Sequence, residues 1–129
     1  MTQNASHAYA RTARTGLSGR ALESTVLVQT ANRLAKASQA PGDQAELIAA
    51  LGHNQKVWAI FARALRHGDT DLPEPERERL QATVDFVALR TYDILQRLPE
   101  FDPGKATGLI EVNRTLAAGL AGQPGTRAA

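Results

Sequence analysis

Apolar side chains recur at steps of three and four residues through most of the chain, which is the spacing of helices that bury one face. Proline or glycine interrupts this pattern between successive stretches. We therefore predict four helices, at about residues 19–38, 44–67, 74–98 and 103–120. Because the β-branched residues that strands favour are few, these helices predict an all-α fold, a small four-helix domain.

Start and stop signals support these helix ends. Ser18 is a candidate N-cap for the first helix, and Asp43 with Glu46 has the spacing of a capping box for the second. Gly68 is a candidate stop for the second helix, because glycine commonly takes the left-handed position after a helix end. Asp102, which a proline follows, is the expected N-cap of the fourth helix.

The two ends of the chain carry no sustained apolar period. The N-terminal end is rich in Thr, Ala, Ser and Arg, and the C-terminal end is rich in Gly and Ala. We expect a flexible arm at residues 1–17, a single helical domain at 18–121 and a flexible tail at 122–129.

The composition agrees with this organisation. The 129 residues include 23 Ala and 15 Leu but only six Val and four Ile, and strands favour the β-branched types. The chain has no Cys, which excludes disulfides, thiol catalysis and cysteine metal sites. Its apolar runs are far shorter than the roughly 20 residues that cross a bilayer. We therefore expect a cytoplasmic protein with no membrane insertion.

The histidines do not form a catalytic or metal-binding set. His7 lies in the expected arm, and His53 and His67 lie about 21 Å apart on one helix at about 1.5 Å per residue. The glycines also lack the spacing of phosphate-binding loops. We expect no enzymatic activity, no cofactor and no small-molecule substrate.

Positive charge concentrates in the N-terminal third of the chain. Residues 1–40 carry a net charge of +4, although the whole chain carries only +2. This charge is either solvated surface or a contact for an acidic partner or RNA. The basic residues concerned are Arg11, Arg14, Arg20, Arg33 and Lys36.

Two asparagines interrupt apolar helix faces. Asn54 lies in the middle of the second apolar stripe, and Asn113 lies in the fourth. A buried amide without a partner costs about 1–3 kcal/mol. Each Asn is therefore expected to bond a neighbouring helix, to lie in water at the stripe edge, or to bond a partner. Gly52, in the same helix as Asn54, indicates either a close backbone neighbour or a tolerated weakness.

Aromatic side chains mark two surfaces. Trp58 and Phe61 lie on the stripe of Asn54 and are either core residues or anchors for a partner. Phe86, Leu89 and Tyr92 form a second apolar face on the third helix. This second face is either covered by another helix or open as a groove for a partner.

At these positions the chain resembles the FlaF family of flagellar regulators. The segment from Leu51 to Phe61 resembles the family pattern L-x-x-N-x-x-L-W-x-I-F, and that from Val112 to Leu120 resembles I-N-x-x-I-A-x-G-L. Ser18–Glu23 resembles the start of the family's first helix, and a block around Phe86–Tyr92 matches a third segment. The likeness runs from about Tyr9 to Leu120. It departs from the pattern in two pairs of positions: Gly52, His53, Ala88 and Leu89.

The resemblance implies a non-enzymatic role in flagellum assembly. Members of the family support flagellin production and export by binding flagellin, and they act alongside the translational regulator FlbT. The expected mechanism is capture of an amphipathic flagellin helix before export. The partner-binding residues expected on this basis are Asn54, Trp58, Phe61, Phe86, Leu89, Tyr92, Asn113 and Leu116.

Two alternatives remain open at the level of sequence. The protein could act on flagellin synthesis through FlbT, using the same surfaces, or contact the flagellin messenger through its N-terminal basic residues. The second alternative lacks the exposed aromatics on which RNA bases usually stack, because Tyr9 is the aromatic residue of that region.

Overall fold

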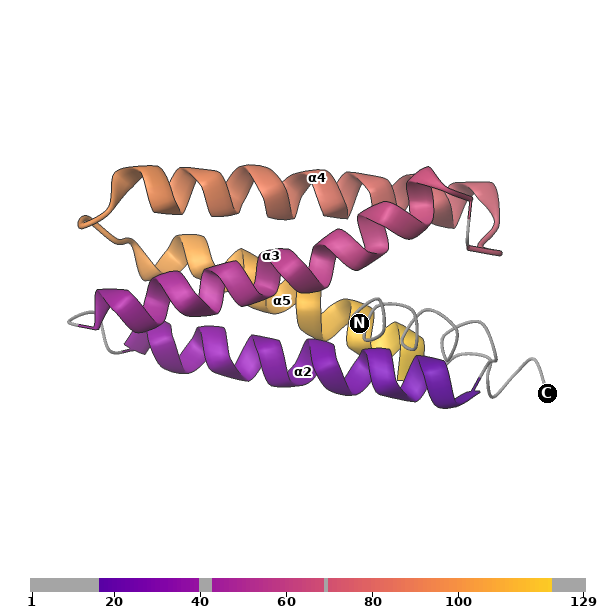
Figure 1. The fold of residues 1–129 in the computed structure, drawn as a ribbon, viewed down its shortest axis with the longest axis horizontal. Coiled ribbons are helices and arrows are strands. Elements are labelled where there is room, and N and C mark those ends of the chain that lie inside the picture. The colour runs from indigo at the N-terminus through magenta and orange to yellow at the C-terminus, as the bar shows by residue number, and fades with distance from the viewer. Residues whose placement is uncertain (1–16, 40–42, 69, 122–129) are drawn as a thin grey trace, which may run out of the picture.

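The computed structural model describes residues 17–39, 43–68 and 70–121. Within them it has four α-helices: α2 (Leu17–Gln39), α3 (Gln44–Arg66), α4 (Glu74–Arg97) and α5 (Pro103–Ala121) (Figure 1). The predicted all-α, four-helix fold is confirmed, and each helix end lies within two residues of its predicted position. The expected arm at 1–17 is wrong at its last residue, because Leu17 begins α2. Residues 1–16 and the expected tail at 122–129 lie outside the described residues.

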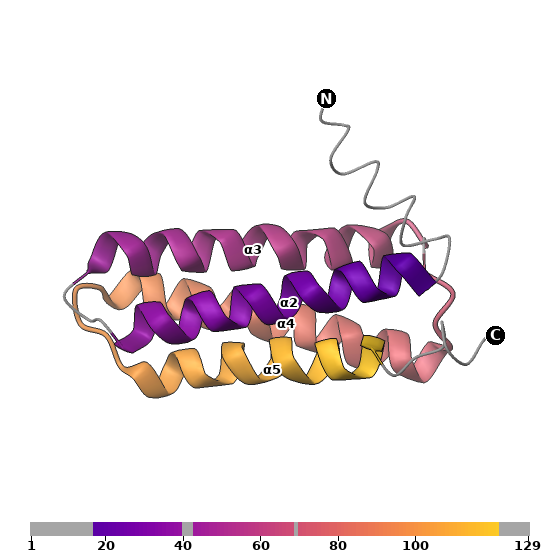
Figure 2. The ribbon, with the colours of Figure 1, turned by 90° about the horizontal axis from the view of Figure 1, so that it is seen from below.

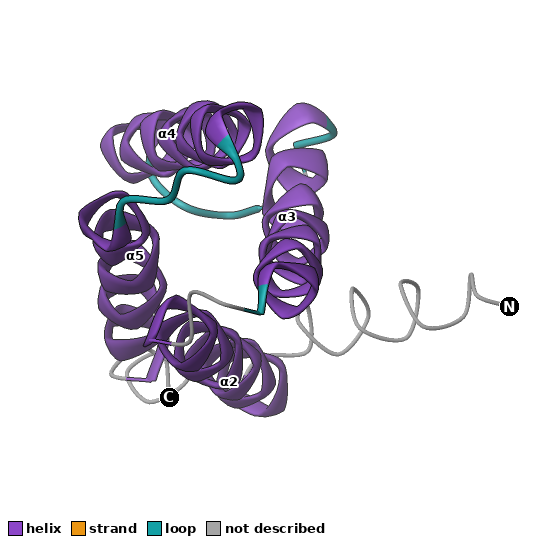
Figure 3. Ribbon diagram, turned by 90° about the vertical axis from the view of Figure 1, so that its left-hand side faces the viewer, coloured by secondary structure: helices purple, strands orange, loops and turns teal. Residues whose placement is uncertain are grey.

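The helices run alternately up and down and form a bundle (Figures 1 and 2). Seen along the bundle, α2 lies between α3 and α5, and α4 lies diagonally opposite α2 (Figure 3). Each helix therefore packs against two neighbours, and the closest association is between α2 and α5. None of the described helices is both long enough and apolar enough to cross a membrane.

The core is unevenly shared among the helices. Seven residues of α3 are buried, but only three of the 24 residues of α4 are buried. Leu27 and Leu34 of α2, Leu51 of α3 and Leu109 of α5 are fully buried at the centre. The hydrophobic core thus lies mainly among α2, α3 and α5, and α4 closes one side of it.

Most of the predicted end signals are confirmed. The side chain of Asp43 accepts a hydrogen bond from the backbone N–H of Glu46 (3.0 Å), which is one half of the expected capping box. The carboxylate of Glu46 instead binds Arg33. Gly68 follows α3 with φ of 66°. The side chain of Asp102 accepts from the N–H of Gly104 at the start of α5 (2.9 Å). The prediction for Ser18 is wrong, because α2 already includes it. A serine near a helix start does not by itself distinguish the N-cap from the first turn.

Gly52 is a tolerated weakness in α3, not a point of close approach. A Cβ at this position would have no atom within 4 Å. We expect Gly52→Ala to raise the free energy of unfolding by about 1 kcal/mol, because alanine restricts the unfolded chain and favours the helix. Chemical denaturation followed by circular dichroism measures this change.

Gly108 of α5 provides the matched control for that substitution. A Cβ there would lie 3.0 Å from Cζ of Phe86 and 3.3 Å from Nη1 of Arg90. Gly108→Ala should therefore gain less stability than Gly52→Ala, or lose some. Equal gains at both glycines would contradict this account of α4–α5 packing.

Candidate functional site

A hydrogen-bonded network of Trp58, Asn113 and Asn54 lies at the centre of the bundle. Nε1 of Trp58 donates to Oδ1 of Asn113 (2.8 Å), and Nδ2 of Asn113 donates to Oδ1 of Asn54 (2.9 Å). Nδ2 of Asn113 also lies 3.5 Å from the carbonyl oxygen of Leu27 in α2. We call these three side chains the polar network; it joins α3 to α5 and reaches α2.

The indole fixes the direction of every bond in this network. Because the indole N–H of Trp58 can only donate, Asn113 must present its oxygen to Trp58 and its amide nitrogen to Asn54. Asn54 must then present its oxygen to Asn113. Of the three roles open for the asparagines from sequence, the structure shows bonding between helices.

Four of the eight residues expected to bind a partner are therefore interior. Asn54, Asn113, Trp58 and Phe61 are buried, and the rings of Trp58 and Phe61 pack at a centroid distance of 5.4 Å. A partner could touch these side chains only if the bundle opened. Leu116 is partly buried against the core.

The outer face of α4 carries the exposed part of the expected set. Leu89 is 70% exposed and Tyr92 is 65% exposed, and the two are one helical turn apart. Phe86 differs from them, because it packs against Gly108 of α5. The guanidinium of Arg90 covers the Phe86 ring at 4.9 Å from its centroid. The second apolar face of the sequence is thus split: its Phe86 edge is covered, and Leu89 and Tyr92 are open.

Charged side chains join α4 to α5 beside this face. Asp93 accepts a hydrogen bond from Lys105 of α5 and a second from Nε of Arg97 on its own helix. These two bonds, with that from Lys105 the stronger, lower the pKa of Asp93 from 3.8 to about 2. Nη1 of Arg90 also donates to the carbonyl oxygen of Lys105 (3.0 Å). We call this group the α4–α5 clasp.

The lowered pKa makes the clasp sensitive to acid. The carboxylate of Asp93 stabilises the fold above the unfolded-state pKa near 3.8, and this stabilisation is lost as the pH falls towards 2. We expect Asp93→Asn to be less stable than the parent protein at pH 7, with the difference shrinking between about pH 4 and pH 2. Urea denaturation at a series of pH values measures it.

Lys105→Met provides the complementary variant, because it removes the stronger partner of Asp93. The loss of stability of Lys105→Met relative to the parent protein should also shrink between about pH 4 and pH 2. High salt should reduce the loss of stability in both variants. A deficit for Asp93→Asn that persists unchanged at pH 2 would contradict a role for the ionised carboxylate.

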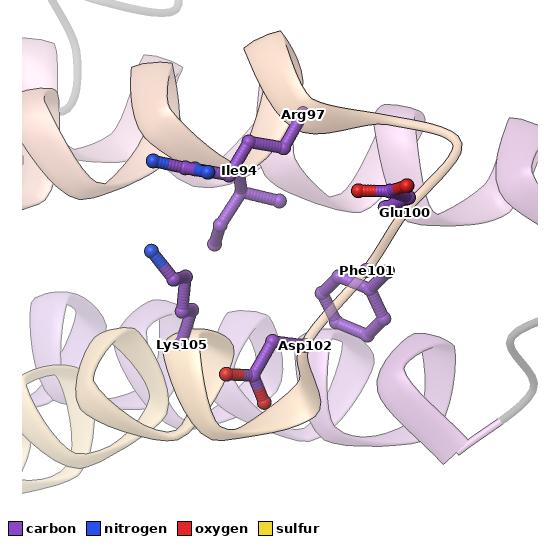
Figure 4. A pocket seen from close by; sticks show the side chains of 6 residues that line it. All are labelled: Ile94, Arg97, Glu100, Phe101, Asp102 and Lys105. Carbon is purple, nitrogen blue, oxygen red and sulfur yellow. The ribbon is translucent and has the colours of Figure 1, made fainter.

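A hollow of about 270 Å³ lies next to the clasp where the chain turns from α4 into α5 (Figure 4). In Figure 4 the side chain of Lys105 extends from α5 towards Ile94 and Arg97 of α4. Three of the polar groups that line the hollow already stabilise the fold: Lys105 and Arg97 bond Asp93, and Asp102 bonds the first turn of α5. The lining residues are Ile94, Arg97, Glu100, Phe101, Asp102 and Lys105.

Of the five basic residues of the N-terminal third, the structure describes the side chains of Arg33 and Lys36. Arg33 donates to both carboxylate oxygens of Glu46 (2.9 and 3.2 Å), which keeps the pKa of Glu46 below its ordinary value and ties α2 to α3. Lys36 is exposed at the end of α2. Arg11 and Arg14 lie outside the described residues, and the side chain of Arg20 is likewise not described. Among the described residues, no three potential metal ligands are grouped.

Comparison with known protein families identifies the chain. The family model of the flagellar protein FlaF matches residues 5–120, which include the four helices of the bundle except Ala121, the last residue of α5. The chain belongs to the FlaF family. Its membership implies a role in flagellar biogenesis. Neither the search of curated proteins nor that of solved structures found a match.

Three residues that match the FlaF pattern are buried in this chain, and the four that depart from it are exposed or partly exposed. Its Asn54 and Trp58 form part of the polar network, and Asn113 of the second motif completes it. The positions that depart from the FlaF pattern lie at the surface or partly exposed: Gly52, His53, Ala88 and Leu89. The motif residues Asn54, Trp58 and Asn113 therefore contribute to packing inside the bundle. The four departures change side chains that a partner could contact at the surface.

Several residues of this FlaF bundle could not be singled out from sequence. The Asp93–Arg97 pair has the i, i+4 spacing that favours a helix ion pair, and this was the available signal. Lys105 bonds Asp93 from α5, and the Phe86 ring packs against Gly108 of α5. Both contacts depend on how α5 packs against α4.

Proposed function

We propose that this FlaF-family protein is a non-enzymatic cytoplasmic chaperone that binds flagellin and so supports its synthesis and export. The observation that supports this proposal is the exposed pair Leu89 and Tyr92 on α4. Burial of these two side chains by a partner would be favourable, by about 25 cal/mol per Å² of apolar surface removed from water.

The shape of this surface suits an amphipathic helix. Ala82, Leu89 and Tyr92 lie on the exposed side of α4, at seven- and three-residue steps. Side chains at this spacing can interdigitate with those of a second helix that packs along α4. Asp85 and Gln96 occupy the same stripe on either side of the apolar pair and supply a polar rim.

The experiment is co-elution of the purified protein with monomeric flagellin on size exclusion, repeated with flagellin that lacks its terminal helices. The expected result is a complex with the full-length flagellin that is lost on truncation. Leu89→Ser with Tyr92→Ser should abolish the complex and leave the helical circular dichroism unchanged. Phe86 is kept, because it packs on α5.

Val28→Ser with Ile48→Ser is the matched control. Val28 and Ile48 are 40% and 44% exposed and lie on α2 and α3, away from the outer face of α4. The control pair should leave flagellin binding intact. If both double variants bind flagellin as the parent does, the α4 surface is not the flagellin site.

Absence of any complex with flagellin would overturn the chaperone proposal. The same column run with FlbT then tests an adaptor role. A salt-dependent affinity for the flagellin leader that is lost on deletion of residues 1–16 would favour RNA contact.

A further inference from the structure

Two buried polar atoms on facing helices lack a partner. Within the described part of the chain, the buried side-chain atoms without a hydrogen bond are Nδ2 of Asn54 in α3 and Oγ1 of Thr91 in α4. Both residues are fully buried. Because a buried polar group without a partner costs about 1–3 kcal/mol, this pair calls for a bonding group between the helices.

The orientation of Asn54 cannot be reversed to remove the problem. Its oxygen is committed to Nδ2 of Asn113, and Asn113 is in turn committed by the donor of Trp58. A flip of Asn54 would set two amide nitrogens against each other. Its Nδ2 donor therefore has to be satisfied on the side away from Asn113.

Thr91 is also unusual among the helical hydroxyls of this bundle. Four others donate to the carbonyl four residues earlier in their own helix: Thr30, Ser38, Thr83 and Thr107. The hydroxyl of Thr91 makes no such bond. Thr91 therefore lacks the local hydrogen bond that a buried helical threonine usually makes.

The two helices that carry these atoms, α3 and α4, pack side by side. The apolar stripe of α3 begins at Leu47, and that of α4 begins at Leu80. The helices are antiparallel, so the stripes pair in opposite order (Figure 1). Asn54 and Thr91 are both fully buried on these two neighbouring helices.

We infer that α3 and α4 enclose a hydration site in which one water molecule bridges Asn54 and Thr91. The water accepts a hydrogen bond from Nδ2 of Asn54 and donates one to Oγ1 of Thr91. Water is suited to this place because it donates and accepts at once, and buried waters typically satisfy otherwise unpaired polar groups. The bridge extends the polar network from Trp58, Asn113 and Asn54 to α4, which otherwise contributes few buried side chains.

Nuclear magnetic resonance of the labelled full-length protein tests the inference directly. Cross-relaxation between water and the Asn54 side-chain amide protons is expected to have opposite signs in the laboratory and rotating frames, as for a long-lived water. Absence of these cross-peaks in the parent protein overturns the site. A direct hydrogen bond from Asn54 to Thr91 without water overturns it as well.

Two isosteric variants separate the bridge from general hydration. Thr91→Val removes one side-chain partner of the water, and the cross-peaks at Asn54 should be lost. Thr30→Val is the control, because Thr30 is buried but its hydroxyl donates to the carbonyl of Val26. Cross-peaks that survive Thr91→Val unchanged would show a water that does not depend on Thr91 and would overturn the bridge. If Thr91→Val fails to fold, the measurement on the parent protein decides alone.

Discussion

Replacing Asn113 with leucine is expected to lower the free energy of unfolding by about 3 kcal/mol. Leucine has nearly the same size as asparagine, so little space opens for water. Nε1 of Trp58 and Oδ1 of Asn54 each lose their partner inside the bundle. The two unpaired groups cost about 1–3 kcal/mol each, and this outweighs the gain from a larger apolar side chain. Urea denaturation followed by Trp58 fluorescence and by circular dichroism measures the loss.

A double-mutant cycle shows whether the loss comes from the polar network. Trp58→Phe removes the donor to Asn113, so Trp58→Phe with Asn113→Leu should cost less than the sum of the single substitutions. Circular dichroism is the common signal for this cycle, since two of its members lack the tryptophan. Additive losses would show that the two side chains act independently.

Asn32→Leu is the matched control for Asn113→Leu. Asn32 is exposed on α2 and accepts a hydrogen bond from Arg114 at the surface (3.2 Å). We expect its replacement to change the stability by less than about 0.5 kcal/mol. A similar loss at both asparagines would mean that burial of the amide is not the cause.

Leu109→Ala is expected to have a comparably large effect, of about 3–4 kcal/mol. Leu109 is fully buried in α5, within the core shared by α2, α3 and α5. Truncation removes the transfer free energy of the side chain and leaves a cavity that rigid neighbouring helices fill only in part. The loss is measured as a lower urea midpoint at an unchanged dependence on urea.

Two leucines of α4 test whether the loss of stability on truncation to alanine follows the burial of the side chain. Leu95 is partly buried against the core, so Leu95→Ala should cost about 1–2 kcal/mol. Leu89 is 70% exposed, and Leu89→Ala should change the stability by less than about 0.5 kcal/mol. If Leu95→Ala cost as much as Leu109→Ala, α4 would be as central to the core as α5, contrary to the observed burial.

Because an exposed leucine contributes little to stability, its replacement can test partner binding without unfolding the bundle. Leu89 contributes little to the bundle, so a loss of flagellin binding on its replacement would report on the surface and not on the fold. Phe86 cannot make this distinction, because its ring fills the space above Gly108. The structure therefore favours Leu89 and Tyr92 as the positions for the binding test.

The helices and their ends follow from local rules and could be predicted from the sequence. The Asp43 cap, the Gly68 stop and the Asp102 start each depend on residues within one helical turn, so no knowledge of distant contacts is needed. Ser18 shows the limit of such signals, because a cap residue is also tolerated in the first turn.

The candidate site was predictable only in part. The apolar period places Leu89 and Tyr92 on the back of α4, but the period does not tell which apolar face a neighbouring helix covers. Gly108 decides this for Phe86, since a glycine in α5 leaves room for the ring. The asparagines were identified as unusual from their stripes, and their burial with Trp58 required the packed structure.

By itself the sequence determined an all-α chain, the positions of its four helices and the two asparagines that interrupt apolar faces, because these depend on spacing within a helix. The tertiary structure alone decided that Trp58 bonds Asn113 across 55 residues, and that Asn113 bonds Asn54 across 59. It also decided that α4 lies at the edge of the core with Leu89 and Tyr92 exposed. The physical reason is that contacts between helices depend on how whole faces pack together, and periodicity within one helix carries no information about its neighbour.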